Sequence, residues 1–243
     1  MKASFKYLIP ILFLISCNPD SDSSFDASSL IVPDYKFSNH LVECILKDGA
    51  NLLTLEIFLS DLVKDKFYKN NQFRLRAYFP KVNYENKFIL NIQNNSNEDI
   101  YSPLINDLSL KSFDQIASCN FITSELKGIS LFDSEIIDKT LPNTSEILKC
   151  NYNEGFNYGT FRIAVDRFLN QMSSLKIPYQ ILYLQDELVA DNFIWINNFY
   201  SEDYSKKIND FWINTPEARE IKNEFLNNAQ CIESNIYYSF AVN

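Results

Sequence analysis

The chain has little of the chemistry on which most enzymes and nucleic-acid-binding proteins depend. Its 243 residues include four glycines and one histidine, His40, which is most simply a surface or edge residue. This scarcity argues against glycine-rich phosphate loops, histidine metal sites and Ser-His-Asp catalysis. The formal net charge is −9 and no long basic block occurs, so nucleic acid is not expected as a partner. The sequence contains no catalytic constellation, and it predicts neither a cofactor nor a metal.

The apolar segment near the N-terminus is too short to span a membrane. Residues 7–15 are apolar apart from one proline, and the run falls well short of the roughly 20 residues that a spanning helix needs. It ends in Leu14-Ile15-Ser16-Cys17, which resembles the lipobox of bacterial lipoproteins. The resemblance implies a signal peptide over residues 1–17 and a lipidated Cys17, with the bilayer as partner. The alternative is an ordinary signal peptide with an incidental cysteine.

The residues after Cys17 bear on the location of the mature chain. Position 18 is Asn, not the Asp that is associated with inner-membrane retention in lipoproteins. The resemblance therefore implies the periplasmic face of the outer membrane, with the periplasmic face of the inner membrane or the cell surface as alternatives. Residues 18–37 are rich in Ser and Asp and contain two prolines, so we expect a disordered tether there.

The remainder of the chain contains an internal repeat. The pattern Cys44, Gly49, Asn51 recurs at the same spacing from Cys150 onward. In both places it is followed by apolar residues at i, i+3, i+4, i+7 and i+8, which form one face of a helix. The common order of these features predicts a duplication, with the first copy at 38–132, a linker at 133–146 and the second copy at 147–243.

Each copy reads as strand, helix, strand, strand, helix, strand. The expected elements are 40–46, 52–64, 73–79, 87–92, 99–110 and 118–132 in the first copy, and 147–152, 158–175, 179–184, 192–197, 201–212 with an extension to 226, and 231–240 in the second.

This βαββαβ order is that of the ferredoxin-like unit. Two such units in tandem resemble a fused version of the dimeric α/β-barrel superfamily, whose members include small monooxygenases, haem-degrading enzymes and stress-responsive barrels. The resemblance implies an α+β fold in which two antiparallel sheets face each other. It says little about activity, because one fold serves many functions.

Four cysteines remain besides Cys17, and they allow three disulfide connectivities. In a ferredoxin-like sheet the first and last strands are neighbours, and each copy carries a cysteine in both. The repeat therefore favours Cys44–Cys119 and Cys150–Cys231, which suits an exported chain. Buried free thiols are the alternative.

A candidate binding site lies on the strands of the second copy. We expect Lys149, Asn151, Tyr183 and Trp195 to line a cleft between the two sheets, because aromatic walls with a few polar groups are typical of small-molecule pockets. Ordinary core packing between two sheets has the same composition and is the alternative.

These features favour a membrane-anchored periplasmic lipoprotein that serves as a non-catalytic binding or structural module. Its partner would be another envelope protein or a small apolar ligand. The alternative function is a cofactor-independent, monooxygenase-like or small-ligand-binding barrel that uses the aromatic cleft. The sequence leaves open whether any reaction is catalysed, although the missing constellation speaks against it.

Overall fold

The computed structural model describes residues 32–64, 73–82, 86–135 and 138–242. The predicted signal peptide, Cys17 and most of the predicted tether lie outside these residues. The helices and strands are β1 (Phe37–Leu46), α2 (Leu52–Val63), β2 (Phe73–Pro80), β3 (Lys87–Asn94), α4 (Tyr101–Leu110), η1 (Phe113–Gln115), β4 (Ala117–Cys119), β5 (Leu126–Asp133), β6 (Asn143–Tyr152), α5 (Tyr158–Leu175), β7 (Tyr179–Gln185), β8 (Asn192–Phe199), α6 (Glu202–Asn214), α7 (Pro216–Asn228) and β9 (Ala229–Ala241).

All strands belong to one nine-stranded sheet, in the order β3-β2-β9-β6-β8-β7-β5-β1-β4. A further pairing between β3 and β1 closes this sheet into a barrel, and β4 extends from β1 outside the closed ring. Each copy contributes the predicted βαββαβ order, and every pairing is antiparallel. The predicted α+β architecture of two facing antiparallel sheets is therefore confirmed.

The last strand of each copy joins the two copies. Strand β5 pairs with β1 of its own copy and with β7 of the other. Strand β9 likewise pairs with β6 of its own copy and with β2 of the other. These reciprocal pairings leave neither half-sheet with an open edge inside the ring, which is how barrels avoid edge-to-edge aggregation.

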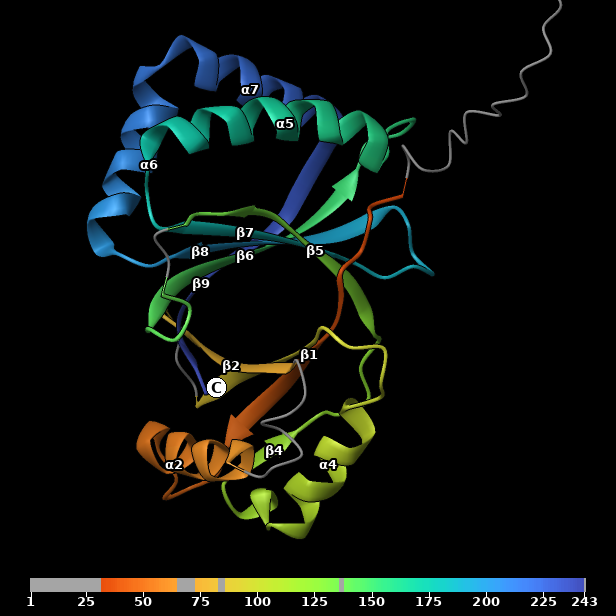
Figure 1. Ribbon diagram of the computed structural model, residues 1–243, viewed down its shortest axis with the longest axis vertical. Coiled ribbons are helices and arrows are strands. Elements are labelled where there is room, and N and C mark those ends of the chain that lie inside the picture. The colour runs from red at the N-terminus through yellow and green to blue at the C-terminus, as the bar shows by residue number, and fades with distance from the viewer. Residues whose placement is uncertain (1–31, 65–72, 83–85, 136–137, 243) are drawn as a thin grey trace, which may run out of the picture.

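The helices cover the outer faces of the two half-sheets (Figure 1). Helices α2 and α4 lie against copy 1, and α5, α6 and α7 lie over copy 2. Three apolar clusters result, one between helices and sheet in each copy and one inside the barrel. The interior cluster contains Phe37, Tyr78, Ile147, Leu182, Leu184, Ile196 and Tyr237.

Local signals in the sequence explain where the helices begin. The side chains of Asn51 and Asn157 accept hydrogen bonds from backbone N–H groups three residues on, which caps α2 and α5. Thr215 caps α7 in the same way, with Pro216 at the first helical position. Gly49 turns the chain from β1 into α2 with a φ of 85°, which glycine adopts without strain.

Both predicted disulfides are confirmed. Cys44 and Cys119 lie directly opposite each other in the β1–β4 register, and Cys150 and Cys231 do so in the β6–β9 register. The bridges close loops of 75 and 81 residues in sequence separation. Loops of this length give a stabilisation of about 4 kcal/mol in the chain-entropy model.

Some element boundaries differ from the prediction. The single strand expected at 118–132 is divided into β4 and β5, and β6 begins at Asn143, inside the segment expected as a linker. Strand β1 begins at Phe37, the last residue of the predicted tether. Among the described residues, no helix combines the length and apolar character that crossing a membrane requires.

Candidate ligand pocket

The four residues predicted to line one cleft lie on two faces of the sheet. Trp195 is directly opposite both Leu148 and Tyr183 in the strand registers, so these three side chains share the face that packs against the helices. Lys149 and Asn151 alternate with Leu148 along β6 and therefore point into the barrel. The strand registers thus divide the four residues between two faces of the sheet, so the expected cleft shared by all four does not form.

Lys149 and Asn151 do not form a binding site with the aromatic residues. Lys149 is exposed at one end of the barrel, and its Nζ lies 2.9 Å from a carboxylate oxygen of Glu233. Asn151 is half-buried. The pair with Glu233 neutralises Lys149, so this end of the barrel presents no unpaired charge at that position.

Tyr183 is part of the core of copy 2. It is fully buried, and its hydroxyl lies 2.8 Å from that of Tyr152. Burial and the neighbouring Tyr152 raise the pKa of Tyr183 far above its usual range, so it remains neutral. Tyr183 therefore stabilises the helix–sheet interface and does not line the pocket.

Trp195, in contrast, lines a pocket of about 610 Å³ between the sheet of copy 2 and its helices. Aromatic residues make up about half of its lining. The aromatic residues are Phe161, Phe168, Tyr179, Phe193, Trp195, Phe199, Trp212 and Phe225.

Helix α7 explains why copy 2 has this pocket. Phe225 on α7 packs against Phe161 and Phe168 of α5, with ring centroids 5.3 and 5.7 Å apart. Trp212 on α6 stacks on Phe168 at 5.4 Å. Among the described elements of copy 1, the three-residue η1 stands where copy 2 has α7. The extra helical segment expected from the sequence thus supplies one wall of the pocket.

The polar end of the pocket is built around Asn197. Its Oδ1 accepts hydrogen bonds from the hydroxyl of Tyr179 and, at 2.6 Å, from Nε1 of Trp195. This fixes the amide so that Nδ2 donates to a carboxylate oxygen of Glu146 at 2.8 Å. The other carboxylate oxygen of Glu146 accepts from Ser234 Oγ at 2.9 Å. Among the described residues, Glu146 forms no ion pair.

The protonation of Tyr179 follows from this arrangement. Burial, and then the nearby Glu146 carboxylate, raise the pKa of Tyr179 well above its usual range. Tyr179 therefore remains a donor to Asn197 at neutral pH. The hydrogen bonds from Tyr179 and Trp195 to Asn197, and from Asn197 to Glu146, end at a half-buried carboxylate that lines the pocket.

Two residues at the polar end, Glu146 and Asn197, are not among the site residues that the sequence predicts. Glu146 lies in the segment expected as a linker, although β6 begins before it, and Asn197 lies at the end of an expected strand. Period-2 alternation from Trp195 would have put Asn197 on the same face. Only the β6–β8 register, which pairs Glu146 with Asn197, brings the two together.

The side chains of the pocket do not suit a haem iron. Haem is relevant because the superfamily that the chain resembles includes haem-degrading enzymes. The only histidine of the chain is His40, which stacks on Tyr101 of copy 1 with ring centroids 3.6 Å apart. The cysteines that line the pocket, Cys150 and Cys231, are joined in a disulfide. The pocket therefore offers neither an imidazole nor a thiolate to a haem iron.

No protein-family model matches the sequence, and no curated protein is significantly similar to it. Solved structures do resemble the fold. A candidate monooxygenase from Fusobacterium nucleatum gives a TM-score of 0.54 at 9% identity, covering 87% of this chain and 94% of its own. A candidate monooxygenase from Lactobacillus acidophilus gives 0.53 at 9%, covering 85% and 95%. An encapsulated DyP-type peroxidase from Mycobacterium smegmatis gives 0.52 at 8%, covering 87% and 94%.

These likenesses concern the fold alone, because the identities are far below the level at which a site is shared. The chain has the dimeric α/β-barrel fold of these neighbours, with both halves in one polypeptide. This confirms the fold that the resemblance implied.

Proposed function

We propose that this protein is a binding module for a small, flat, apolar molecule that carries one hydrogen-bond donor. The observation that carries the proposal is the pocket of copy 2, with aromatic walls and a single half-buried carboxylate at its polar end. Aromatic walls favour a planar apolar body, and Glu146 favours a hydroxyl or amino group on that body. The neighbours in structure support a small-molecule role only at the level of the fold.

The resemblance of residues 14–17 to a lipobox supports a place for this module at a membrane surface. Anchored through Cys17 on the periplasmic face of the outer membrane, the folded part would bind ligand close to the bilayer. Apolar molecules concentrate there, which fits the character of the pocket.

Tryptophan fluorescence provides a site-specific test. Both tryptophans of the chain, Trp195 and Trp212, line the pocket, so the emission reports on this site. We expect 2-naphthol to change the emission saturably. We expect 2-methoxynaphthalene, which lacks the donor, to bind roughly tenfold more weakly, as the loss of a hydrogen bond to a charged group implies. Absence of saturable change with both probes would refute the proposal.

Substitution of the carboxylate separates the donor contact from general apolar binding. Glu146→Gln should remove most of the preference for 2-naphthol and leave binding of 2-methoxynaphthalene nearly unchanged. Glu233→Gln is the matched control, because that carboxylate pairs with Lys149 on the barrel side. An equal loss of preference in both variants would contradict the role of Glu146.

One observation favours a second candidate, oxygenation of the bound molecule without a cofactor. Glu146 is placed to accept a proton from a bound phenol, which would make the ring more electron-rich. Mass spectrometry after incubation of 2-naphthol in air distinguishes the candidates. Recovery of unchanged 2-naphthol fits a binding module, and an oxygenated product lost in Glu146→Gln would fit an enzyme.

A further inference from the structure

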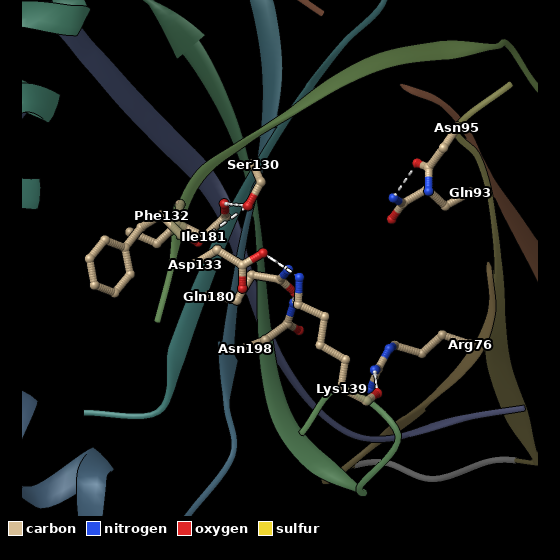
Figure 2. Close-up of polar contacts among 10 residues, drawn as sticks. All are labelled: Arg76, Gln93, Asn95, Ser130, Phe132, Asp133, Lys139, Gln180, Ile181 and Asn198. Atoms are coloured by element: carbon tan, nitrogen blue, oxygen red, sulfur yellow. Dashed lines mark hydrogen bonds and ion pairs between the residues drawn. The ribbon is translucent and has the colours of Figure 1, made fainter. Parts of the chain in front are cut away.

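One end of the barrel interior is polar and encloses a small cavity of about 160 Å³. Arg76 and Asn91 face each other across β2 and β3 of copy 1, and Gln180 and Asn198 face each other across β7 and β8 of copy 2. Figure 2 shows Arg76 approaching from one side and Gln180 and Asn198 from the other, with Lys139 between them. This cavity is separate from the aromatic pocket, which lies on the outer face of the sheet.

Hydrogen bonds hold the walls of the cavity in place. The guanidinium of Arg76 donates to the side chain of Asn143 and, at 2.8 Å, to the carbonyl of Lys139. Across the cavity, Asn198 Nδ2 donates to Gln180 Oε1 at 3.0 Å. The lining side chains are therefore positioned without any ligand, which lowers the entropic cost of binding.

Two polar atoms that face this cavity have no partner among the described residues. Asn91 is 4% exposed, and its Nδ2 donates to Tyr78 at 3.3 Å while its Oδ1 accepts nothing. The hydroxyl of Tyr200 is also buried and unpartnered. An unsatisfied buried polar group is costly, so such groups commonly meet a ligand or water. The cavity thus offers one unused acceptor and one unused donor.

The cavity is electropositive in a chain of net charge −9. Arg74, Arg76 and Lys139 line it, and no carboxylate is found among its described lining residues. Lys139 pairs with Asp133, but the partners of the half-buried Arg76 are neutral oxygens. A half-buried charge with neutral partners favours a bound counter-ion, and a guanidinium suits a carboxylate in particular.

We propose that this cavity binds a small carboxylate that also carries a hydroxyl or amino group. The carboxylate would meet Arg76 and the Tyr200 hydroxyl, and the second group would donate to Asn91 Oδ1. The volume corresponds to roughly five water molecules, which admits a molecule the size of lactate.

Calorimetric titration of the purified chain with L-lactate, propionate and inorganic phosphate tests the proposal. Propionate is lactate without the hydroxyl, so we expect it to bind at least roughly tenfold more weakly than lactate. Equal binding of the two overturns the role of Asn91 and the proposal with it. Tighter binding of phosphate overturns the assignment to carboxylates, and no saturable heat from any of the three overturns the site.

Two variants test whether lactate binds in this cavity. Arg74→Gln should weaken lactate binding several-fold, whereas Lys149→Gln, which removes a barrel-facing cation at another position, should leave it unchanged. Equal effects would indicate a general response to charge and overturn the site.

Two substitutions of Asn91 provide a second test, which remains available if either of the first two variants folds poorly. Asn91→Leu should abolish lactate binding. Asn91→Asp is nearly isosteric and supplies an internal carboxylate next to Arg76, so it should also abolish binding but unfold at a higher temperature than Asn91→Leu. A lower unfolding temperature for Asn91→Asp would show that the cavity rejects negative charge, against the proposal.

Discussion

In the proposed binding role, one carboxylate, Glu146, would set which ligands the aromatic pocket of copy 2 accepts. Its two oxygens are oriented by Asn197 and Ser234, and the orientation of Asn197 is itself set by Tyr179 and Trp195. All these partners are neutral, so they form no ion pair with Glu146, and its two oxygens keep some acceptor capacity. In this proposal, selectivity for a donor-bearing ligand would depend on the four neutral side chains that orient Glu146.

His40 should make the stability of the fold depend on pH. Burial lowers the pKa of His40, with Glu125 and Asp99 opposing and Lys127 adding to the shift. A histidine with a lowered pKa contributes stability above its unfolded pKa, near pH 6.5, which is lost as the pH falls through the folded value. Urea unfolding should therefore show lower stability at about pH 6 than at about pH 7.5.

The variant His40→Gln isolates this contribution, because the chain has no other histidine. The variant should lose most of the difference between the two pH values. An unchanged difference would mean that other groups, such as a carboxylate with a raised pKa, cause it.

Residue-scale features were predictable where the repeat relates two positions. The cysteine pairs follow from the repeat because first and last strands must be neighbours in each copy. The face of Trp195 was not predictable, since alternation shows which residues share a face but not which face is inward. The site residues Glu146 and Asn197 also depend on a strand register that hydrophobic patterning alone does not specify.

At the scale of elements, the divided last strand of copy 1 shows how the two copies constrain each other. Strand β4 pairs with one end of β1, and β5 pairs with the other end and with β7. In between, the Phe121 carbonyl accepts a hydrogen bond from the Tyr101 hydroxyl at 2.8 Å, outside the ladder. Pattern within one copy predicts a continuous strand there, like β9 in copy 2, because it does not show where the chain leaves the ladder.

The two disulfides should contribute equally to stability but unequally to binding. Replacing Cys44 and Cys119 by alanine, or Cys150 and Cys231, should each lower the free energy of unfolding by about 4 kcal/mol, because the loops are of similar length. Only the second bridge lines the aromatic pocket, so only its removal should weaken binding of 2-naphthol. Equal affinities in both double variants would contradict the position of the binding site.

At the scale of the whole molecule, the aromatic pocket and the polar cavity relate differently to the two copies. The outer pocket lies in copy 2, where α7 provides a wall; in the part of copy 1 that the structure describes, the short η1 stands in its place. The polar cavity draws its walls from both copies and exists only because β5 and β9 close the barrel. The shared βαββαβ order of the two copies thus builds the closed barrel that holds the polar cavity, and the added helix α7 of copy 2 builds the aromatic pocket.

The lipobox resemblance makes a prediction about the location of this whole molecule. If Cys17 carries lipid, Cys17→Ser should move the protein from the membrane to the soluble fraction, since buried acyl chains contribute about 0.8 kcal/mol per CH₂ to anchoring. The variant should keep the fold and the binding of 2-naphthol, because β1 begins only at Phe37. Ser16→Ala, which retains a small residue before the cysteine, is the control and should remain in the membrane. Two results together would contradict anchoring through this residue. The variant Cys17→Ser would stay in the membrane, and the intact mass of the unaltered protein would show no acyl groups.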